Sequence, residues 1–339
     1  MQEFNSIDII SLQEAPEEAI HDFTPRTFDQ FIGQKLLKEK LSIYTKAAKM
    51  RNESLDHLLF SGPPGLGKTT ISNIMAQEMN VAIKICSGPM LERTGDLVAI
   101  LSGLQPRDIL FIDEIHRTPK AVEEVLYSAM EEFRIDIIIG QGAGAKTVNL
   151  PLHPFTLIGA TTKAGLLTAP LRSRFGITER LDFYDDEELQ IIVQQYASYL
   201  MIQLSKEGAL RIAKAARGTP RIAKKLTRRV RDFAQVKQLK LIEDTIVKES
   251  LNFLGIDEEG LTAVDNLILT KMIKNYGGGP LGLETIASLI GEDSDTIEAV
   301  YEPFLMRKGY IKKTPRGRQI PHLMVLKLKR KLFGQENIF

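Results

Sequence analysis

Glycines, a lysine and two threonines gather in SGPPGLGKTT, residues 61–70, directly after an apolar run. A glycine-rich turn that leads into a helix directs backbone N–H groups and the positive end of the helix dipole at one point, where an anion can bind. The pattern G-x-x-x-x-G-K-[ST] predicts a triphosphate site, in which the lysine reaches the β and γ phosphates and the next threonine meets Mg²⁺. Its members are Gly62, Gly67, Lys68 and Thr69, with Gly65 inside the turn and Thr70 deeper in the same cradle.

Two adjacent carboxylates follow a second apolar run, in ILFIDEIHR, and the first of them lies 45 residues after Lys68. The four apolar residues 109–112 predict a buried strand whose end exposes both acids. One acid at such a strand end can hold Mg²⁺ through its water shell, and a second can orient or deprotonate the attacking water. We therefore expect Asp113 at the metal and Glu114 at the water. The alternative is an acid pair that caps a helix beginning near Pro119.

Hydroxyls and arginines further along suit phosphoryl transfer, which depends mainly on positioning and charge neutralisation. The segment LIGATTKAG ends a buried strand with Thr161 and Thr162, whose hydroxyls can hold the water or the γ-phosphate from the opposite side. The segment LRSRFG offers Arg172 and Arg174, either of which can neutralise developing phosphate charge as an arginine finger. The alternative for either arginine is a surface ion pair. Together with the glycine-rich turn, these residues predict ATP hydrolysis.

Apolar runs that alternate with helical stretches must position these groups. The runs are HLLFSG near 57, VAIKIC near 81, DILFID near 108 and PFTLIGATT near 154. This alternation predicts an α/β fold, a parallel sheet with helices on both faces, extending to about Tyr184. Residues 134–150 predict a hairpin around a loop with three glycines. Its isoleucine-rich strand indicates either packing within the chain or a docking surface for a partner.

From Asp185 the pattern becomes helical with no strand runs, first in a small domain and then, after FLGIDEEG, in a third segment. That segment predicts three helices followed by YIKKTPRGRQI, in which a proline and a glycine indicate a turn between two short strands. Helices that end in a basic hairpin resemble a winged helix. Its cations predict salt-dependent contacts to DNA phosphates, the alternative being a solvated basic face. They are Arg307, Lys308, Lys312, Lys313, Arg316 and Arg318.

Length and composition limit the possibilities further. The chain has 339 residues, of which 43% are hydrophobic. This length is greater than a single hydrophobic core usually organises, so two or three domains are expected. The 44 Lys plus Arg nearly balance the 43 Asp plus Glu, yet residues 1–25 hold no Lys or Arg whereas 303–335 hold ten. The single cysteine, Cys86, excludes an internal disulfide and is expected in the core. With no basic leader and no apolar run of about 18 residues, we expect a cytoplasmic protein without membrane contact.

Five segments resemble, in their order, the RuvB family of bacterial Holliday-junction branch-migration motors, which are AAA+ ATPases. They are GPPGLGKTT, ILFIDEIHR, IGATTKAGLL, APLRSRFGI and GTPRIAKKL. The resemblance runs from about Phe23 to Lys331, and TPRGR in the basic hairpin makes it specific to RuvB. It leaves an acidic N-terminal extension over 1–22 uncovered, and it implies an AAA+ P-loop ATPase domain over 23–184, a helical lid over 185–255 and a winged-helix domain over 256–339.

The resemblance also implies roles for single residues. Arg174 would be the finger that enters the ATP site of the next subunit, and Arg221 would be the lid's sensor of the nucleotide state. The first sensor would be Thr162, with Thr161 as the alternative. The nucleotide-binding set would include Ile32 and Gly33 beside the adenine, Tyr184 at the domain hinge, and Phe23. Lys313, Arg316 and Arg318 would bind DNA.

Partners follow from the same resemblance. It implies a homo-hexameric ring around double-stranded DNA at four-way junctions, powered by ATP with Mg²⁺ and releasing ADP, in homologous recombination and recombinational repair. The 134–150 hairpin would dock on RuvA, and RuvC would join the resolving complex. Cleavage of ATP would change the angle between the sheet domain and the lid, and the ring would convert this change into movement along DNA.

Three positions depart from the usual pattern of the family. Thr24 stands where an arginine near the nucleotide is common, and Ser294 replaces a usual arginine. Lys313 replaces another arginine, which keeps the charge but loses the bidentate fork. The residues by themselves leave two other functions open. One is an AAA+ clamp loader or initiator, which shares the ATP motifs, and the other is a winged-helix regulator that ATP merely switches.

Overall fold

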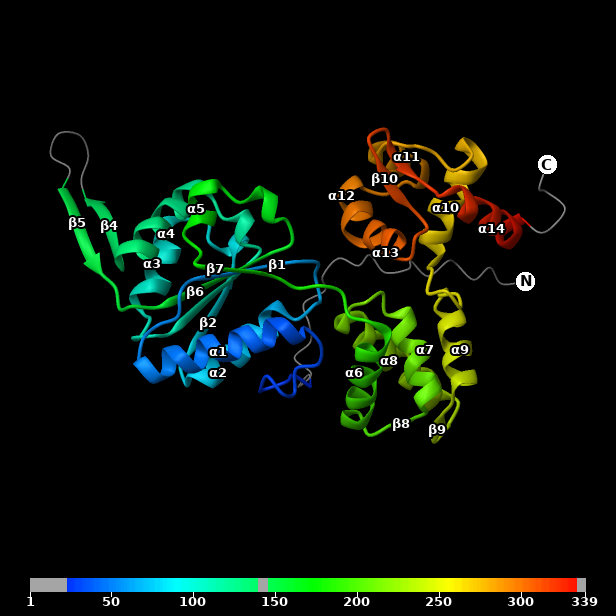
Figure 1. Ribbon diagram of the computed structural model, residues 1–339, viewed down its shortest axis with the longest axis horizontal. Helices are drawn as coiled ribbons and strands as arrows, with labels where there is room; N and C mark the ends of the chain where they lie inside the picture. The colour runs from blue at the N-terminus through cyan, green and yellow to red at the C-terminus, as the bar shows by residue number, and fades with distance from the viewer. Residues whose placement is uncertain (1–22, 140–145, 334–339) are drawn as a thin grey trace. The chain divides into compact units, whose positions relative to one another are not determined.

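A computed structural model describes residues 23–139 and 146–333 of the chain (Figure 1). The fold forms two compact units. One comprises residues 24–200 and 218–228, and the other comprises 201–217 and the chain from 229 onward. Each unit has its own hydrophobic core. No helix in the described ranges is long and apolar enough to cross a membrane.

The first unit is built on a five-stranded parallel sheet in the order β2-β3-β6-β1-β7. The four apolar runs expected as strands all lie in it. The fifth strand, β7, was not expected from the sequence. The strands are β1 (Leu58–Ser61), β2 (Ile83–Ser87), β3 (Ile109–Asp113), β6 (Thr156–Thr161) and β7 (Ile177–Arg180).

Helices cover both faces of this sheet, as expected (Figure 1). Because side chains alternate along a strand, Leu110 and Ile112 of β3 point into the core beneath α3 and α4, and Phe111 is buried on the opposite face. Cys86 lies in the same core, where burial raises the pKa of its thiol to about 11. The helical segments are α1 (Lys35–Arg51), α2 (Lys68–Met79), α3 (Thr94–Ser102), α4 (Lys120–Glu132) and α5 (Ala169–Ser173), with short turns η1 (Gly88–Met90), η2 (Ile115–Arg117) and η4 (Ala164–Leu166).

The expected hairpin is present as β4 (Arg134–Ile139) and β5 (Lys146–Pro151), which pair antiparallel. Residues 140–145, its glycine-rich loop, lie outside the described residues. At the base of the hairpin, Ile135 is only 1% exposed and packs into the core of the sheet domain. Packing within the chain therefore accounts for Ile135, and docking of a partner on the rest of the hairpin stays a prediction.

Helices dominate the next segment, as expected from residue 185 onward. Asp185 and Glu188 form the capping box of α6, and Ser205 caps α7 through its bond from the Gly208 amide. The expectation of no strands there is wrong by one small element, because β8 and β9 pair in parallel over two residues each. The elements are α6 (Asp186–Tyr199), β8 (Gln203–Leu204), α7 (Lys206–Ala215), α8 (Pro220–Val236), β9 (Leu241–Ile242) and α9 (Asp244–Phe253).

The last segment has the three expected helical stretches and the basic hairpin, followed by a helix that was not expected, α14. The third stretch is continuous but contains a π-helical turn, η5, just before Pro303, which lacks the N–H that a regular turn needs. The elements are α10 (Ala263–Tyr276), α11 (Leu283–Ile290), α12 (Ser294–Thr296), η5 (Ile297–Tyr301), α13 (Glu302–Arg307), β10 (Lys312–Thr314), β11 (Gly317–Gln319) and α14 (His322–Phe333).

Candidate nucleotide site

The glycine-rich turn connects β1 to α2, which begins at Lys68 with Gly67 as its N-cap. All three glycines of the turn have positive φ, at 136°, 78° and 100° along the chain. At Gly65 a side chain is excluded twice, because the backbone is left-handed and a Cβ atom would lie 2.9 Å from the Cβ of Arg221. The turn therefore presents bare backbone to whatever lies at the start of α2, as an anion cradle requires.

Lys68 is the buried cation of this turn, with an exposed fraction of 7%. Its Nζ donates hydrogen bonds to the carbonyl oxygens of Gly62 at 2.8 Å and Pro63 at 3.0 Å. Burial lowers the pKa of the ammonium, and the nearby carboxylates Asp113 and Glu114 partly offset that effect. The charge is thus held inside the turn, at the position where the motif requires a contact to phosphate.

Asp113, Ser61 and Thr161 end three neighbouring parallel strands, so they lie at one edge of the sheet. Asp113 accepts a hydrogen bond from the backbone N–H of Glu114 at Oδ1, at 3.0 Å. Glu114 itself has a φ of 48°, in the left-handed region that residues other than glycine seldom occupy.

The carboxylate of Glu114 meets the end of β6. The hydroxyl of Thr162 donates to Glu114 Oε2 at 3.1 Å. Thr161, which is fully buried, lies instead 2.9 Å from His116 Nδ1, measured from its Oγ1. Of the two threonines expected as sensors, Thr162 is therefore the one in contact with Glu114. His116 was missed by sequence reasoning, although it lies within the quoted ILFIDEIHR motif.

Two residues expected beside the adenine, Gly33 and Tyr184, contact each other next to the glycine-rich turn. The ring of Tyr184 lies so close to Gly33 that a Cβ atom there would be 2.5 Å from it. The Tyr184 hydroxyl donates to the carbonyl of Leu66 at 3.2 Å, and burial raises the pKa of this phenol. A further residue, Phe31, packs against Gly67 and was not expected. Its position directly before the IGQ segment could have indicated that Phe31 lies near the glycine-rich turn.

Arg221 lies next to the turn, where its backbone N–H donates to the Gly65 carbonyl at 3.4 Å and its side chain is exposed. For Ile32, which is half-buried, and for Phe23, a nucleotide contact stays a prediction. The same holds for Thr69 and Thr70, which are half-buried in the first turn of α2.

Arg174 is placed by α4 and α5 and not by the glycine-rich turn. Its guanidinium donates to the Pro170 carbonyl at 2.8 Å and to Glu131 at 3.1 Å, and it lies 4.5 Å from the ring centre of Tyr127. Arg172 donates to the carbonyl of Ala164. Among the described residues, the partners of both arginines lie in α4, α5 and η4, and the role of either as a finger stays a prediction.

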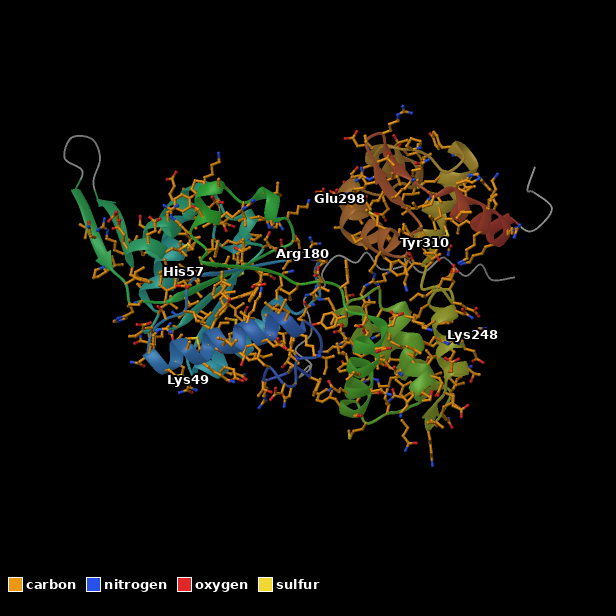
Figure 2. All side chains as sticks on the ribbon, in the orientation of Figure 1. Lys49, His57, Arg180, Lys248, Glu298 and Tyr310 are labelled. Atoms are coloured by element: carbon orange, nitrogen blue, oxygen red, sulfur yellow. The ribbon has the colours of Figure 1, made fainter. Side chains whose placement is uncertain are left out.

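The basic hairpin of the second unit has cations that pair with acids of α13 and η5, and others that are exposed. Arg318 donates two hydrogen bonds, each 3.1 Å, to Glu302, whose side chain is 4% exposed. Lys313 lies 3.4 Å from Glu302 and from Glu298, a residue labelled in Figure 2. Arg316 lies exposed in the turn of the hairpin. Arg318 therefore has a structural role, and its expected role in DNA binding stays untested.

The parallel sheet with its P-loop, the acids at the end of β3, the following helical lid and the winged helix together define an AAA+ ATPase. Three family models match in succession: the Holliday junction DNA helicase RuvB P-loop domain over residues 23–181, the RuvB AAA lid domain over 184–257 and the RuvB C-terminal winged helix domain over 258–327. The chain belongs to the RuvB family.

Individual relatives agree with this assignment. The Holliday junction branch migration complex subunit RuvB of Ligilactobacillus salivarius is 56% identical over 296 residues, which cover 87% of this chain and 88% of that one. The corresponding subunit of Enterococcus faecalis is 54% identical over 306 residues, 90% of each chain. The solved structure of the Thermotoga maritima RuvB Holliday junction branch migration motor superposes with a TM-score of 0.80 at 48% identity, covering 90% of this chain and 97% of that one.

Proposed function

We propose that this chain is an ATP-driven motor that moves double-stranded DNA and thereby branch-migrates Holliday junctions in homologous recombination and repair. Its three domains each match a RuvB family model, and the three matches together cover most of the chain. The observation that carries the catalytic part is the convergence of the buried Lys68 with Glu114 and its Thr162 partner at one edge of the sheet. A P-loop domain that binds ATP without hydrolysing it would not need a carboxylate held in this way.

The residues at the turn fit ATP and ADP with Mg²⁺. Bare backbone at the three glycines, the N-terminus of α2 and a buried ammonium are suited to a triphosphate. Lys68 would bind the β and γ phosphates, Thr69 and Asp113 would hold Mg²⁺, and Thr70 would add a hydroxyl. ATP supplies the phosphoanhydride bond whose hydrolysis releases the energy for movement.

Glu114 would accept a proton from the attacking water. Its Oε2 already accepts a hydrogen bond from Thr162, which leaves Oε1 to orient the water. Charge that develops on the phosphoryl oxygens would be neutralised by Lys68 within the chain and by Arg174 of a neighbouring subunit. Arg221, beside Gly65, would report the nucleotide state to the lid.

The assembly we propose is a homo-hexameric ring around duplex DNA. RuvA would dock on the 134–150 hairpin, and RuvC would act in the resolving complex. In the winged helix, Arg316 is exposed in the turn of the basic hairpin and would contact phosphates, which suits a motor that moves along any sequence.

The experiment that tests the function is ATP-dependent migration of a synthetic four-way junction, with and without RuvA. We expect Lys68→Ala to abolish ATP binding, ATPase and migration, whereas the surface variant Lys49→Ala, on α1, should retain all three. Clamp opening instead of migration would favour a loader. Slow, DNA-insensitive turnover with tight binding to one operator would favour a regulator.

The interfacial finger has its own test. Arg174→Ala should lose hydrolysis and largely retain ATP binding. Lys68→Ala protein has an intact finger and Arg174→Ala protein has an intact P-loop, so mixed rings should recover part of the ATPase. Absence of recovery under demonstrated subunit exchange would contradict a finger that acts between subunits.

A further inference from the structure

We propose that His116 is a positioning residue, which fixes the carboxylate of Glu114 so that one of its oxygens remains directed at the attacking water. The proposal rests on the proposed function, in which Glu114 activates that water. It adds a residue whose role depends on the geometry between two strand ends.

His116 lies on η2, directly after the end of β3, and its side chain is 7% exposed. Its Nδ1 is 3.2 Å from Glu114 Oε2 and 2.9 Å from Thr161 Oγ1. The backbone N–H of Lys163 in turn donates to Thr161 Oγ1 at 3.1 Å. A chain of polar contacts therefore connects Glu114, through His116, to the end of β6.

The partner of Nδ1 decides the tautomer. An ionised carboxylate can only accept hydrogen bonds, so a proton on Nδ1 makes the 3.2 Å approach to Glu114 Oε2 favourable, and we assign the proton to Nδ1 on that ground. Burial lowers the pKa of His116, with a partly offsetting effect from Glu114, which favours the neutral ring. In the neutral Nδ1–H tautomer this hydrogen lies between Thr161 Oγ1, the hydrogen-bond partner at 2.9 Å, and Glu114 Oε2, 3.2 Å from Nδ1.

Two side chains consequently meet at one oxygen of Glu114: Thr162 donates a hydrogen bond to it, and Nδ1 of His116 lies 3.2 Å from it. Thr162 reaches Oε2 from the end of β6, and His116 reaches it from η2. Glu114 needs such support because its backbone has the unfavourable φ of 48° and its side chain is half-buried. With Oε2 held from two sides, Oε1 is the oxygen that remains for water.

Another buried histidine of the same unit serves as the matched comparison. His57 accepts a hydrogen bond from the Leu157 amide at Nδ1, 2.9 Å away, and its Nε2 lies 3.0 Å from the Met130 carbonyl. These partners are backbone groups in the core of the sheet domain, so His57 contributes to stability. His116, by contrast, contacts a carboxylate at the proposed site of chemistry.

Three variants separate positioning from a structural role. His116→Phe keeps the ring but removes the donor, and we expect kcat for DNA-stimulated ATP hydrolysis to fall about 10- to 100-fold. The dissociation constant for ATP and the melting temperature should change little. His116→Asn can place an amide N–H near the position of Nδ1 and should recover most of the activity. His57→Phe should lower the melting temperature while kcat per folded molecule is retained.

A double-mutant cycle then tests whether His116 acts through Glu114. In single-turnover assays, Glu114→Gln should stall hydrolysis, and adding His116→Phe should change the remaining rate less than about two-fold. The proposal is overturned if His116→Phe is fully active, if Asn and Phe are equally inactive, or if the two losses multiply. The outcomes also distinguish the role of Glu114 from that of His116. Full turnover by Glu114→Gln would reject the water-activating role itself, whereas a stalled Glu114→Gln with an active His116→Phe would reject only the role of His116.

Discussion

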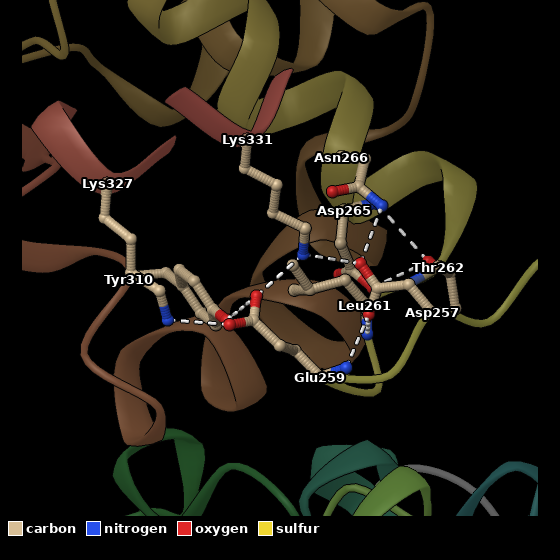
Figure 3. A network of polar contacts seen from close by, with 9 residues as sticks. All are labelled: Asp257, Glu259, Leu261, Thr262, Asp265, Asn266, Tyr310, Lys327 and Lys331. Carbon is tan, nitrogen blue, oxygen red and sulfur yellow. Dashed lines mark hydrogen bonds and ion pairs between the residues drawn. The ribbon is translucent and has the colours of Figure 1, made fainter. Parts of the chain in front are cut away.

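The charged groups of the nucleotide site and those of the acidic network in the second unit differ in how far the chain itself supplies their partners. At the nucleotide site, Lys68 and Glu114 stand at a sheet edge with a strained backbone and with capacity for further partners. In the acidic network, by which we mean Asp257 and Glu259 with the groups around them, each carboxylate is enclosed by donors that the chain supplies itself (Figure 3).

Glu259 shows how many donors the chain supplies to one carboxylate, although its side chain is 31% exposed. It accepts hydrogen bonds from Lys327 at 2.6 Å, Lys331 at 2.7 Å and the Tyr310 hydroxyl at 2.7 Å. Asp257 accepts from Lys331 at 2.8 Å and, at its other oxygen, from two backbone amides at 2.9 Å each. The loop after α9 is thereby fixed to α14 and to Tyr310, two residues before β10.

A buried ion pair lies beside this network. Arg217, just after α7, pairs with Asp265 of α10, and its guanidinium lies 4.6 Å from the ring centre of Phe304. Asp265 is fully buried and also accepts two bonds from Thr262 at 2.7 Å. Since α7 belongs to the lid segment and α10 to the winged helix, these contacts hold the two segments together.

The two sets of charges therefore have different roles. Where the chain satisfies its own charges, removing one leaves its partner uncompensated in a low-dielectric interior, and stability is lost. Where charges are positioned but not saturated, removing one costs binding or rate, and the fold tolerates the change. The following variants test this division, in order of decreasing expected effect.

The largest loss of stability should come from Arg217→Met. This variant leaves Asp265 buried without its cation, which costs about 3–5 kcal/mol, and the urea midpoint should fall accordingly. The matched control is Arg211→Met on α7. Arg211 pairs with Asp244, and their side chains are 29% and 36% exposed, respectively. Breaking such a pair costs about 0–1 kcal/mol. Equal losses in the two variants would contradict the contrast between buried and exposed charge.

The second variant addresses the other half of the comparison. Glu114→Gln should lower kcat by about 10²- to 10³-fold, because the amide cannot accept the proton of the attacking water. The melting temperature should stay within about 2 °C, since a change of 1 kcal/mol shifts it by roughly 2–4 °C in a domain of this size. ATPase assays and thermal unfolding of the same preparation check both expectations. A large fall in melting temperature would place Glu114 among the structural charges instead.

A third, smaller effect depends on pH. Burial alone would raise the pKa of Glu259, but hydrogen bonds from the two ammonium groups and the phenol lower it to about 2, from an ordinary 4.5. A depressed folded-state pKa contributes stability above pH 4.5 and loses it as the pH falls toward 2. Glu259→Gln should therefore cost about 1 kcal/mol at pH 7 after solvent screening.

The measurement is urea unfolding of the parent protein and the variant at several pH values. The gap between them should narrow steadily below pH 4.5. Glu258→Gln, at an exposed position of the same loop, is the control and should show a much smaller gap. A gap that is independent of pH would mean that Glu259 acts through its shape and not through its charge.

The sequence allowed the prediction of those parts that depend on local pattern. Strands β1, β3 and β6 are apolar runs because both of their faces are buried. Strand β2 lies at the edge of the sheet, where Ile85 is 53% exposed, but its apolar residues were still enough to predict it. Strand β7 was missed because, as an edge strand with the sequence Ile-Thr-Glu-Arg, it has only one apolar residue. Helix α14 was missed because it follows the basic hairpin and is itself rich in lysine, with Val325 and Leu328 as its buried contacts to the core.

Residue types at the nucleotide site were also predictable, since the P-loop and the acid pair are contiguous motifs. Pairings between distant segments were not. His116 meets Thr161 only because β3 and β6 are neighbours in the sheet, and Arg318 meets Glu302 only because the hairpin folds back on α13. No spacing in the sequence distinguishes a cation that pairs internally from one that faces solvent.

The last prediction applies this distinction to the winged helix and has the smallest expected effect. Arg316→Ala should weaken binding to duplex DNA to a similar degree at all sequences and reduce the slope of log K against log salt by about 1. Lys248→Ala, on α9 and labelled in Figure 2, is the control and should leave the slope unchanged. Arg318→Ala should instead lower the melting temperature, because Glu302 would remain buried without its bidentate partner. If Arg318→Ala keeps the melting temperature and flattens the salt slope as Arg316→Ala does, then its pair with Glu302 is dispensable and Arg318 belongs with the DNA-facing charges.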